Sequence, residues 1–143
     1  MAIKQLSIFV ENREGTLVNV TDAIAKAQVD IRAMSVADTN DFGIFRLIVT
    51  DYDKAKAALD EANCFVSITE VVGVAVDDEP GALAKVIKVL AEHNINIEYM
   101  YAFITVSRQY AYVVLRVADN DAAEAILTEN GIKLVSAEDI ANL

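Results

Sequence analysis

Two short acidic stretches contain the residues of this chain that could take part in binding chemistry. Glu11–Leu17 reads ENREGTL and Asp77–Leu83 reads DDEPGAL, and each follows an apolar run and precedes a helical pattern. A strand that ends in a tight glycine turn and opens a helix leaves backbone N–H groups unpaired, and these groups attract anions. The helix dipole contributes about 0.3–2 kcal/mol to holding a carboxylate, whereas micromolar binding requires about 8 kcal/mol. Each stretch therefore predicts part of an anion site, with a purely structural turn as the alternative.

The other reactive side chains predict packing or solvation. His93, the only histidine, falls where a helical pattern ends, and a histidine there usually caps or packs. Cys64, the only cysteine, begins a strand-like run with no basic neighbour, which predicts an inert thiol and excludes an internal disulfide. The acidic run Asp77–Glu79 has no second oxygen-rich loop with metal-site spacing. We therefore expect no metal, no cofactor and no catalytic residues, that is, a protein that is not an enzyme.

Composition excludes two classes of partner. The net charge is −10, with 12 basic against 22 acidic residues, so no basic face for a phosphate backbone is expected. The run of tyrosines at 99, 101, 110 and 112 suggests base stacking, but basic surroundings are missing and subunit packing explains it better. No apolar window approaches the roughly 18 residues of a membrane span, and the start lacks the features of a signal peptide. We expect a soluble, cytoplasmic protein that binds neither nucleic acid nor membranes.

The chain repeats itself over nearly its whole length. At an offset of 66 residues the matching pairs are Val10 and Val76, Gly15 and Gly81, Leu17 and Leu83, Val20 and Val86, Ala25 and Ala91, Ile31 and Ile97, and Met34 and Met100. At an offset of 68 residues they are Leu47 and Leu115, Val49 and Val117, Asp51 and Asp119, Asp53 and Asp121, and Ala55 and Ala123. Matches in register over this length indicate a duplication.

Each repeat predicts the order β-α-β-β-α-β. Runs rich in β-branched and aromatic residues predict strands over 3–10, 29–37, 43–50 and 64–71, and over 71–76, 95–106, 110–118 and 132–137. Helical spacing follows each glycine turn. Asp51 and Asp119 are expected to cap the second helices. Pro80 suits a first helical turn and Asn94 a helix stop, and residues 136–143 predict one more capped turn.

This order predicts an α+β protein of two ferredoxin-like βαββαβ sandwiches in tandem, each an antiparallel sheet with two helices on one face. We expect the domains at residues 1–71 and 72–143, with no linker between them. The face of the sheets opposite the helices is too apolar for a wet surface, as Ile44 and Ile48 illustrate. Such a face predicts another sheet or subunit, hence a homodimer. A monomer with a few apolar surface residues is the alternative.

The stretches ENREGTL and DEPGAL, followed by VDI and INI in this element order, resemble the ACT domain, a regulatory module of amino-acid biosynthetic enzymes. The resemblance covers residues 2–71 and 72–138, and the whole chain looks like small stand-alone bacterial proteins of two ACT domains. It implies a fold of paired sheets with an amino acid bound where two domains meet. It also implies a separate partner enzyme of amino-acid metabolism.

In ligand-binding ACT domains an Asn in the loop before helix one and an Asn at the start of strand two commonly contact the ligand. The resemblance places these positions at Asn12 and Asp78 in the loops and at Asp30 and Asn96 in the strands. The full set of residues implied as ligand-binding is Asn12, Arg13, Glu14, Gly15, Thr16, Leu17, Asp30, Ile31, Asp78, Glu79, Pro80, Gly81, Ala82, Leu83, Asn96 and Ile97.

Each repeat thus keeps one Asn and has Asp at the other position. An Asp cannot donate to a carboxylate but can accept from an ammonium group, so the two sites would differ. The alternative for these four positions is that they are solvent-facing polar residues. Glu14 replaces the proline found at Pro80, and Thr16 is expected mainly to cap its own helix. Of the two turns, we expect the one at Asn12 to bind.

Three hypotheses follow. The first is a homodimeric sensor that binds an amino acid or similar small metabolite between ACT domains and modulates a partner enzyme. The second is a ligand-free assembly module for a metabolic enzyme, since Glu14, Asp30 and Asp78 add negative charge where a carboxylate would sit. The third, an enzyme, rests only on the acidic turns.

Overall fold

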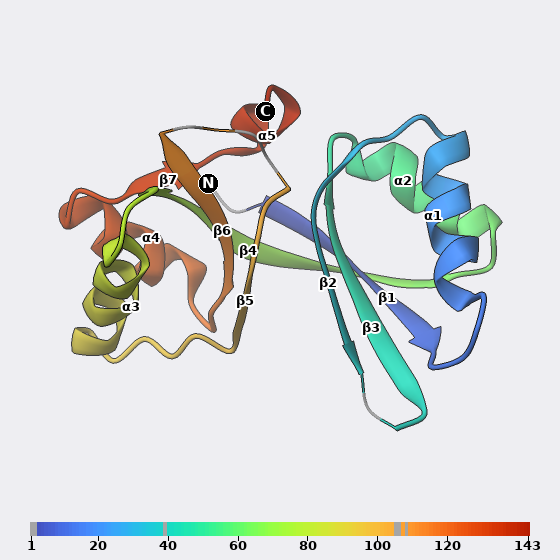
Figure 1. Ribbon diagram of the computed structural model, residues 1–143, viewed down its shortest axis with the longest axis horizontal. Helices are drawn as coiled ribbons and strands as arrows, with labels where there is room; N and C mark the ends of the chain where they lie inside the picture. Colours follow the sequence, from blue (N-terminus) through green and yellow to red (C-terminus); the bar gives the residue numbers. More distant parts are fainter. Residues whose placement is uncertain (1–2, 39, 105–106, 108) are drawn as a thin grey trace. The chain divides into compact units, whose positions relative to one another are not determined.

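The computed structural model describes residues 3–38, 40–104, 107 and 109–143. This part of the chain forms two compact units (Figure 1). The N-terminal unit is Lys4–Thr69, and the C-terminal unit is Glu70–Leu143 together with Ile3. The contacts thus divide the chain two residues before the predicted boundary at 71/72, and the assignment of domains to 1–71 and 72–143 stays a prediction.

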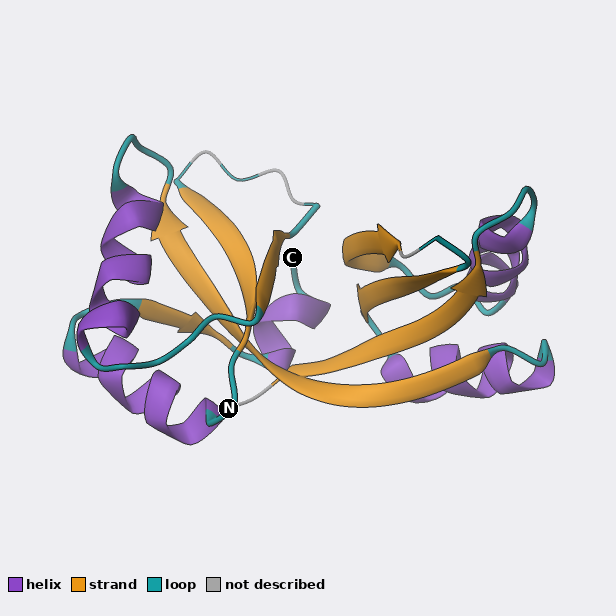
Figure 2. Cartoon of the chain, turned by 90° about the horizontal axis from the view of Figure 1, so that it is seen from below, coloured by secondary structure: helices purple, strands orange, loops and turns teal. Residues whose placement is uncertain are grey.

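The N-terminal unit is a four-stranded antiparallel sandwich. Its elements are β1 (Ile3–Glu11), α1 (Thr16–Lys26), β2 (Ile31–Asp38), β3 (Phe42–Val49), α2 (Tyr52–Glu61) and the first part of β4 (Phe65–Asp77). The strand order is β2-β3-β1-β4. Helices α1 and α2 lie together on one side of the strands (Figures 1 and 2). The predicted ferredoxin-like order is therefore confirmed.

The C-terminal unit repeats this plan and adds a short helix. After the second part of β4 come α3 (Ala82–Glu92), β5 (Tyr99–Ala102), β6 (Tyr110–Arg116), α4 (Asn120–Glu129), β7 (Lys133–Val135) and α5 (Ala137–Ala141). The strand order is β5-β6-β4-β7. The strand predicted over 95–106 is shorter than expected: residues 95–98 lie outside the ladder, and 105 and 106 fall outside the described residues.

Helix ends follow local rules. The side chains of Asp51 and Asp119 accept from the backbone N–H of Lys54 (3.1 Å) and Ala122 (3.0 Å), so both predicted caps are confirmed. The first four helices each end with a left-handed residue and a pair of Schellman hydrogen bonds; these residues are Gln28, Asn63, Asn94 and Gly131. The predicted stop at Asn94, with φ 59°, is thus confirmed, as is the final helix, which Ser136 opens with a capping box.

Each unit has its own core on the helical face of its sheet. Phe45, Leu47 and Val49 of β3 belong to the first core, and Val113, Leu115 and Val117 belong to the second, as the alternation predicts. On the opposite face of the N-terminal unit, Ile48 is buried whereas Phe9 is 54% exposed. The second face is therefore apolar as expected, and part of it meets solvent in this chain.

Candidate functional site

The two glycine turns have the same backbone conformation. Gly15 (φ 82°, ψ −6°) and Gly81 (φ 89°, ψ −12°) are left-handed N-cap residues, and neither helix start receives a hydrogen bond from a capping side chain. Only glycine adopts this region freely. Backbone N–H groups in the first turns of α1 and α3 therefore have no side-chain cap, which is the arrangement that binds anions at a helix start.

Pro80 shapes the second turn rather than the helix. The Ala82 N–H donates to Glu79 O (3.3 Å), which closes a turn with Pro80 and Gly81 at its centre. A fixed negative φ followed by a glycine with φ near +80° defines a type II turn. The helix begins only at Ala82, so the prediction that Pro80 lies in the first helical turn is wrong.

Thr16 also acts differently from the prediction. Its hydroxyl donates backwards, to Glu11 O (2.8 Å) and Arg13 O (3.0 Å), and does not cap α1. These bonds tie the start of α1 to the end of β1. Arg13 forms an ion pair with Glu11, while Glu14 is exposed. The first turn is thus held by side chains where the second is held by Pro80.

Both turns are anchored to the hairpin beside them. The Asn12 N–H donates to Asp41 O (3.0 Å), and the Asp78 N–H donates to Gln109 O (3.2 Å). The side chains of Asn12 and Asp78 are exposed. Leu17 and Leu83, which follow the turns, are 40% and 38% exposed, so the two helix starts offer similar apolar contact.

The strand positions lie at the opposite end of each sheet. The Asp30 N–H donates to Thr50 Oγ1 (3.1 Å), and the Thr50 N–H donates to Asp30 O (3.0 Å), which places Asp30 beside the end of β3. Its carboxylate lies 3.5 Å from Arg32 Nη1. Asn12, in contrast, lies beside the start of β3.

The same separation holds in the C-terminal unit. Asn96 is exposed and precedes Glu98, whose N–H donates to Arg116 O at the far end of β6 (2.8 Å). Asp78 lies at the other end of β6, beside Gln109. The next residues, Ile31 and Ile97, pack against the two cores. No unit brings its own loop and strand positions together, so a site that uses both requires residues of two units.

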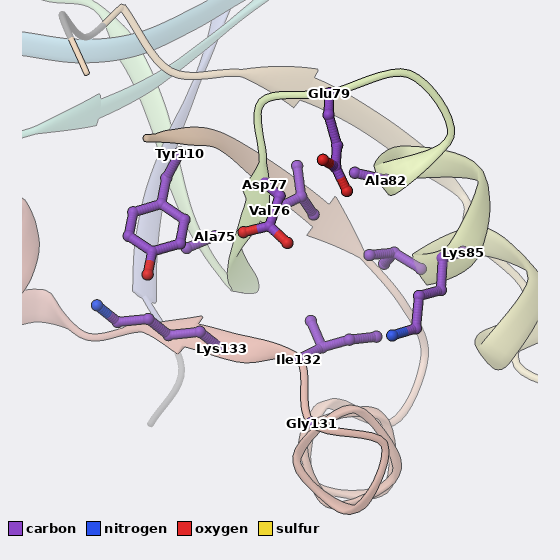
Figure 3. A pocket seen from close by; sticks show the side chains of 11 residues that line it. Ala75, Val76, Asp77, Glu79, Ala82, Lys85, Tyr110, Gly131, Ile132 and Lys133 are labelled. Atoms are coloured by element: carbon purple, nitrogen blue, oxygen red, sulfur yellow. The ribbon is translucent and has the colours of Figure 1, made fainter. Parts of the chain in front are cut away.

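A cleft of about 260 Å³ opens beside the second glycine turn, entirely within the C-terminal unit (Figure 3). Its lining is Ala75, Val76, Asp77, Glu79, Ala82, Lys85, Val86, Tyr110, Gly131, Ile132 and Lys133. Of the predicted site residues, Glu79 and Ala82 reach it. Lys85, Tyr110 and Lys133 were missed because they come from α3, β6 and β7, which no local sequence spacing links. Of these three, only Lys85 could have been found from the sequence, because it lies three residues after Ala82 and therefore on the same face of the helix.

The charged groups of this cleft are not paired with one another. Within the described part of the chain, no ion pair within 4 Å joins Asp77, Glu79, Lys85 or Lys133 to any residue. The Lys133 ammonium lies 5.1 Å from the centre of the Tyr110 ring, a cation–π contact. The Lys85 ammonium and the carboxylates of Asp77 and Glu79 therefore have no ion-pair partner among the described residues, whereas the Lys133 ammonium contacts the Tyr110 ring.

The remaining reactive residues behave structurally. His93 Nδ1–H donates to Val89 O (2.8 Å), which confirms its role at the end of α3. Burial, and secondarily the nearby Asp60 carboxylate, raises the pKa of the Cys64 thiol, as expected for a weakly reactive cysteine. Across residues 3–38, 40–104, 107 and 109–143, no three His, Cys, Asp or Glu side chains are grouped to hold a metal ion. Among the described helices none is long and apolar enough to cross a membrane.

Comparison with known proteins identifies the family. The sequence model of the family described as ACT domain pair matches residues 1–143, so the chain belongs to this family of regulatory domains. A protein of Bacteroides thetaiotaomicron has 42% identity over 100% of this chain and 98% of its own, with a TM-score of 0.93. No curated protein matches the chain.

More distant solved structures share the fold. The regulatory subunit of aspartate kinase from Thermus thermophilus has 16% identity over 88% of this chain and 91% of its own, with a TM-score of 0.61. Aspartate kinase from Synechocystis has 24% identity over 93% of this chain but only 26% of its own, with a TM-score of 0.60. At these identities the likeness establishes the ACT pair fold alone.

Proposed function

We propose that this ACT domain pair is an amino-acid-sensing regulator, a homodimer that binds an amino acid between ACT units and tunes a separate enzyme. The observation that supports it most strongly is the pair of uncapped helix starts at Gly15 and Gly81. Each could accept a carboxylate, and each lies beside one of the loop positions Asn12 and Asp78. Since loop and strand positions of one unit lie at opposite ends of its sheet, such a site would be shared between units.

The shared site gives regulation a physical basis. A ligand held by two units stabilises the arrangement in which those units meet. The difference in the ligand's affinity for the two arrangements sets how far the equilibrium between them shifts. Couplings of this kind typically amount to about 1–3 kcal/mol. The solved regulatory subunit of aspartate kinase supports a regulatory role on a separate enzyme. A cytoplasmic location remains part of the proposal.

The test is binding of the twenty amino acids, first by thermal shift and then by calorimetry. We expect one or a few ligands with dissociation constants below 1 mM. Asn12→Asp should weaken binding because the carboxylate repels the ligand's own, whereas Asp78→Asn should preserve or strengthen it. Asn142→Asp, at the exposed end of α5 and away from both turns, is the matched control and should leave binding unchanged. If no amino acid binds below millimolar concentration, the sensor function is wrong.

A second candidate function is an assembly module without a small ligand. It is favoured by the first turn, where Arg13 already pairs with Glu11 and Glu14 adds a further negative charge. Pull-down from native lysate with and without an amino-acid mixture separates the two. A partner enzyme retained equally under both conditions favours assembly, and a partner whose retention changes with the mixture favours sensing.

A further inference from the structure

The cleft beside the second glycine turn exists because β7 is short. On one side β4 pairs with β6 as far as Asp77 opposite Tyr110, but on the other side it pairs with β7 only from Gly73 to Ala75. Left-handed Gly131 ends α4 and brings the chain into β7 too late to cover Val76. The last residues of β4 therefore have no β7 partner, and the space beside them is the cleft.

Charged groups from three elements surround this space. Figure 3 shows the carboxylates of Asp77 and Glu79 and the ammonium group of Lys85 extending into the cleft, with Lys133 along the Tyr110 ring. Ile132 and Val86 form an apolar wall, and both are buried. Because the lining includes two positive and two negative groups, its own net charge is zero. A neutral ligand carrying both signs would leave that balance unchanged.

The equivalent place in the N-terminal unit has different chemistry. The repeat aligns Asp77, Glu79 and Lys85 with Glu11, Arg13 and Asn19, and aligns Lys133 with Phe65. There Glu11 and Arg13 pair with each other, and no lysine is present at the helix position. The free mixture of charges is therefore a property of the C-terminal unit alone.

The volume limits the ligand to a small molecule. Pockets for drug-sized ligands measure about 300–1,000 Å³, and this cleft measures about 260 Å³. A compact molecule with one cationic and one anionic group matches both the size and the charges. Its anionic group would contact Lys85 near the start of α3, and its cationic group would lie between Asp77 and Glu79.

We propose that this cleft binds a small neutral α-amino acid within a single ACT unit, through Lys85, Asp77 and Glu79. The ligand class rests on the proposed sensing function, but the place does not: it requires neither a second unit nor the strand positions Asp30 and Asn96. Each chain would then hold one such ligand, in its C-terminal unit.

The proposal is tested by calorimetry on the full chain with each neutral amino acid as the probe. The amide signals of Lys85 and Ile132 in ¹⁵N NMR spectra locate the bound molecule. Lys85→Gln and Asp77→Asn should each weaken binding about tenfold or more, since each removes a charge-assisted contact. Lys88→Gln, on the same helix but outside the cleft, is the control and should leave affinity unchanged. Unchanged circular dichroism of all three variants shows that they fold.

Ligand analogues provide a second measurement. For the amino acid that binds, the amine lacking the carboxylate and the carboxylic acid lacking the amino group should both fail to bind. Binding that survives Lys85→Gln and Asp77→Asn unchanged overturns the cleft proposal and leaves the sensor function intact. Binding that depends on Lys85 but is unaffected by Asn12→Asp supports the cleft and removes the shared site at that turn. If no amino acid binds at all, both proposals are overturned.

Discussion

Gly15 and Gly81 are the residues on which both helix starts depend. With φ of 82° and 89° they lie in the left-handed region, which costs an L-residue with a side chain about 1–2 kcal/mol. A Cβ added at either position would meet nothing within 4 Å. Glycine is therefore required for its backbone conformation and not for lack of space. A substitution at either position measures the cost of that conformation alone, because the new side chain clashes with nothing.

Gly81→Ala should accordingly lower the free energy of unfolding by about 1–2 kcal/mol. Urea denaturation followed by circular dichroism measures this loss. Gly81→Asn is the matched comparison and should lose less, because Asn tolerates the left-handed region. Equal stability of Gly81→Ala and the unchanged protein would contradict the role assigned to this backbone conformation.

Residue-level predictions from the sequence were right where the physics is local. Asp51 and Asp119 cap helices through an N–H three residues away, so the sequence contains both partners of the bond. Pro80 was misplaced because its role depends on the turn that Gly81 completes. Lys133 could not have been assigned to a cleft, since only the pairing of β7 with β4 brings it near Asp77.

At the scale of elements, α5 shows how one short helix is held. The Ser136 N–H donates to the Asp139 carboxylate (2.8 Å), the Asp139 N–H donates back to Ser136 Oγ (3.1 Å), and Ile140 is buried. The bond from the Ser136 backbone, and secondarily the Ser136 side chain, lowers the pKa of Asp139 below its ordinary value of about 3.9. The charged form of Asp139 is therefore the form that stabilises α5.

The helix should consequently depend on pH. A carboxyl group whose pKa is lowered in the folded state contributes its full stabilisation above the unfolded value of about 3.9, and this contribution is lost as pH falls through the folded value. NMR chemical shifts of Ile140 should report fraying of α5 below about pH 4. Asp139→Asn should remove this titration, whereas Glu138→Gln, the exposed neighbour, should keep it. An Asp139→Asn titration identical to that of the unchanged protein would contradict the assignment.

Element order was predictable from alternation and turn residues, but element length was not. The runs 64–71 and 71–76 predicted two strands, whereas the chain forms the single 13-residue strand β4. Conversely, residues 95–106 predicted a long strand, whereas β5 covers Tyr99–Ala102 and, among the described residues, is followed by a single bridge at Phe103. Apolar sequence specifies a tendency to be extended, whereas ladder length depends on the partner strand, which lies elsewhere in the chain.

At the scale of the whole molecule, the exposed apolar face bears on oligomeric state. Phe9 is 54% exposed on β1, and Phe42 is 56% exposed on β3. Their register places Phe9 opposite Ile44 and Phe42 opposite Glu11, on the face away from the first core. Exposed apolar side chains grouped on one face favour association of this face with a second copy of the chain.

Phe9→Ser should therefore shift the proposed homodimer towards monomer, which light scattering coupled to size exclusion measures directly. Val18→Ser is the matched control, because Val18 is equally exposed (56%) but lies on helix α1. A monomeric unchanged protein, or a dimer lost equally in both variants, would contradict the role of this face.

Strand β4 supplies core residues to both units from positions of the same parity. Val66 packs in the first core and Val72, Val74 and Val76 pack in the second, all at even-numbered positions of one uninterrupted strand. Because side chains alternate with a period of two, inserting one residue at Thr69 would put the core positions before and after it out of phase along the strand. Inserting two would restore the phase. Insertions that keep β4 unbroken and its core positions in phase should therefore come in pairs of residues.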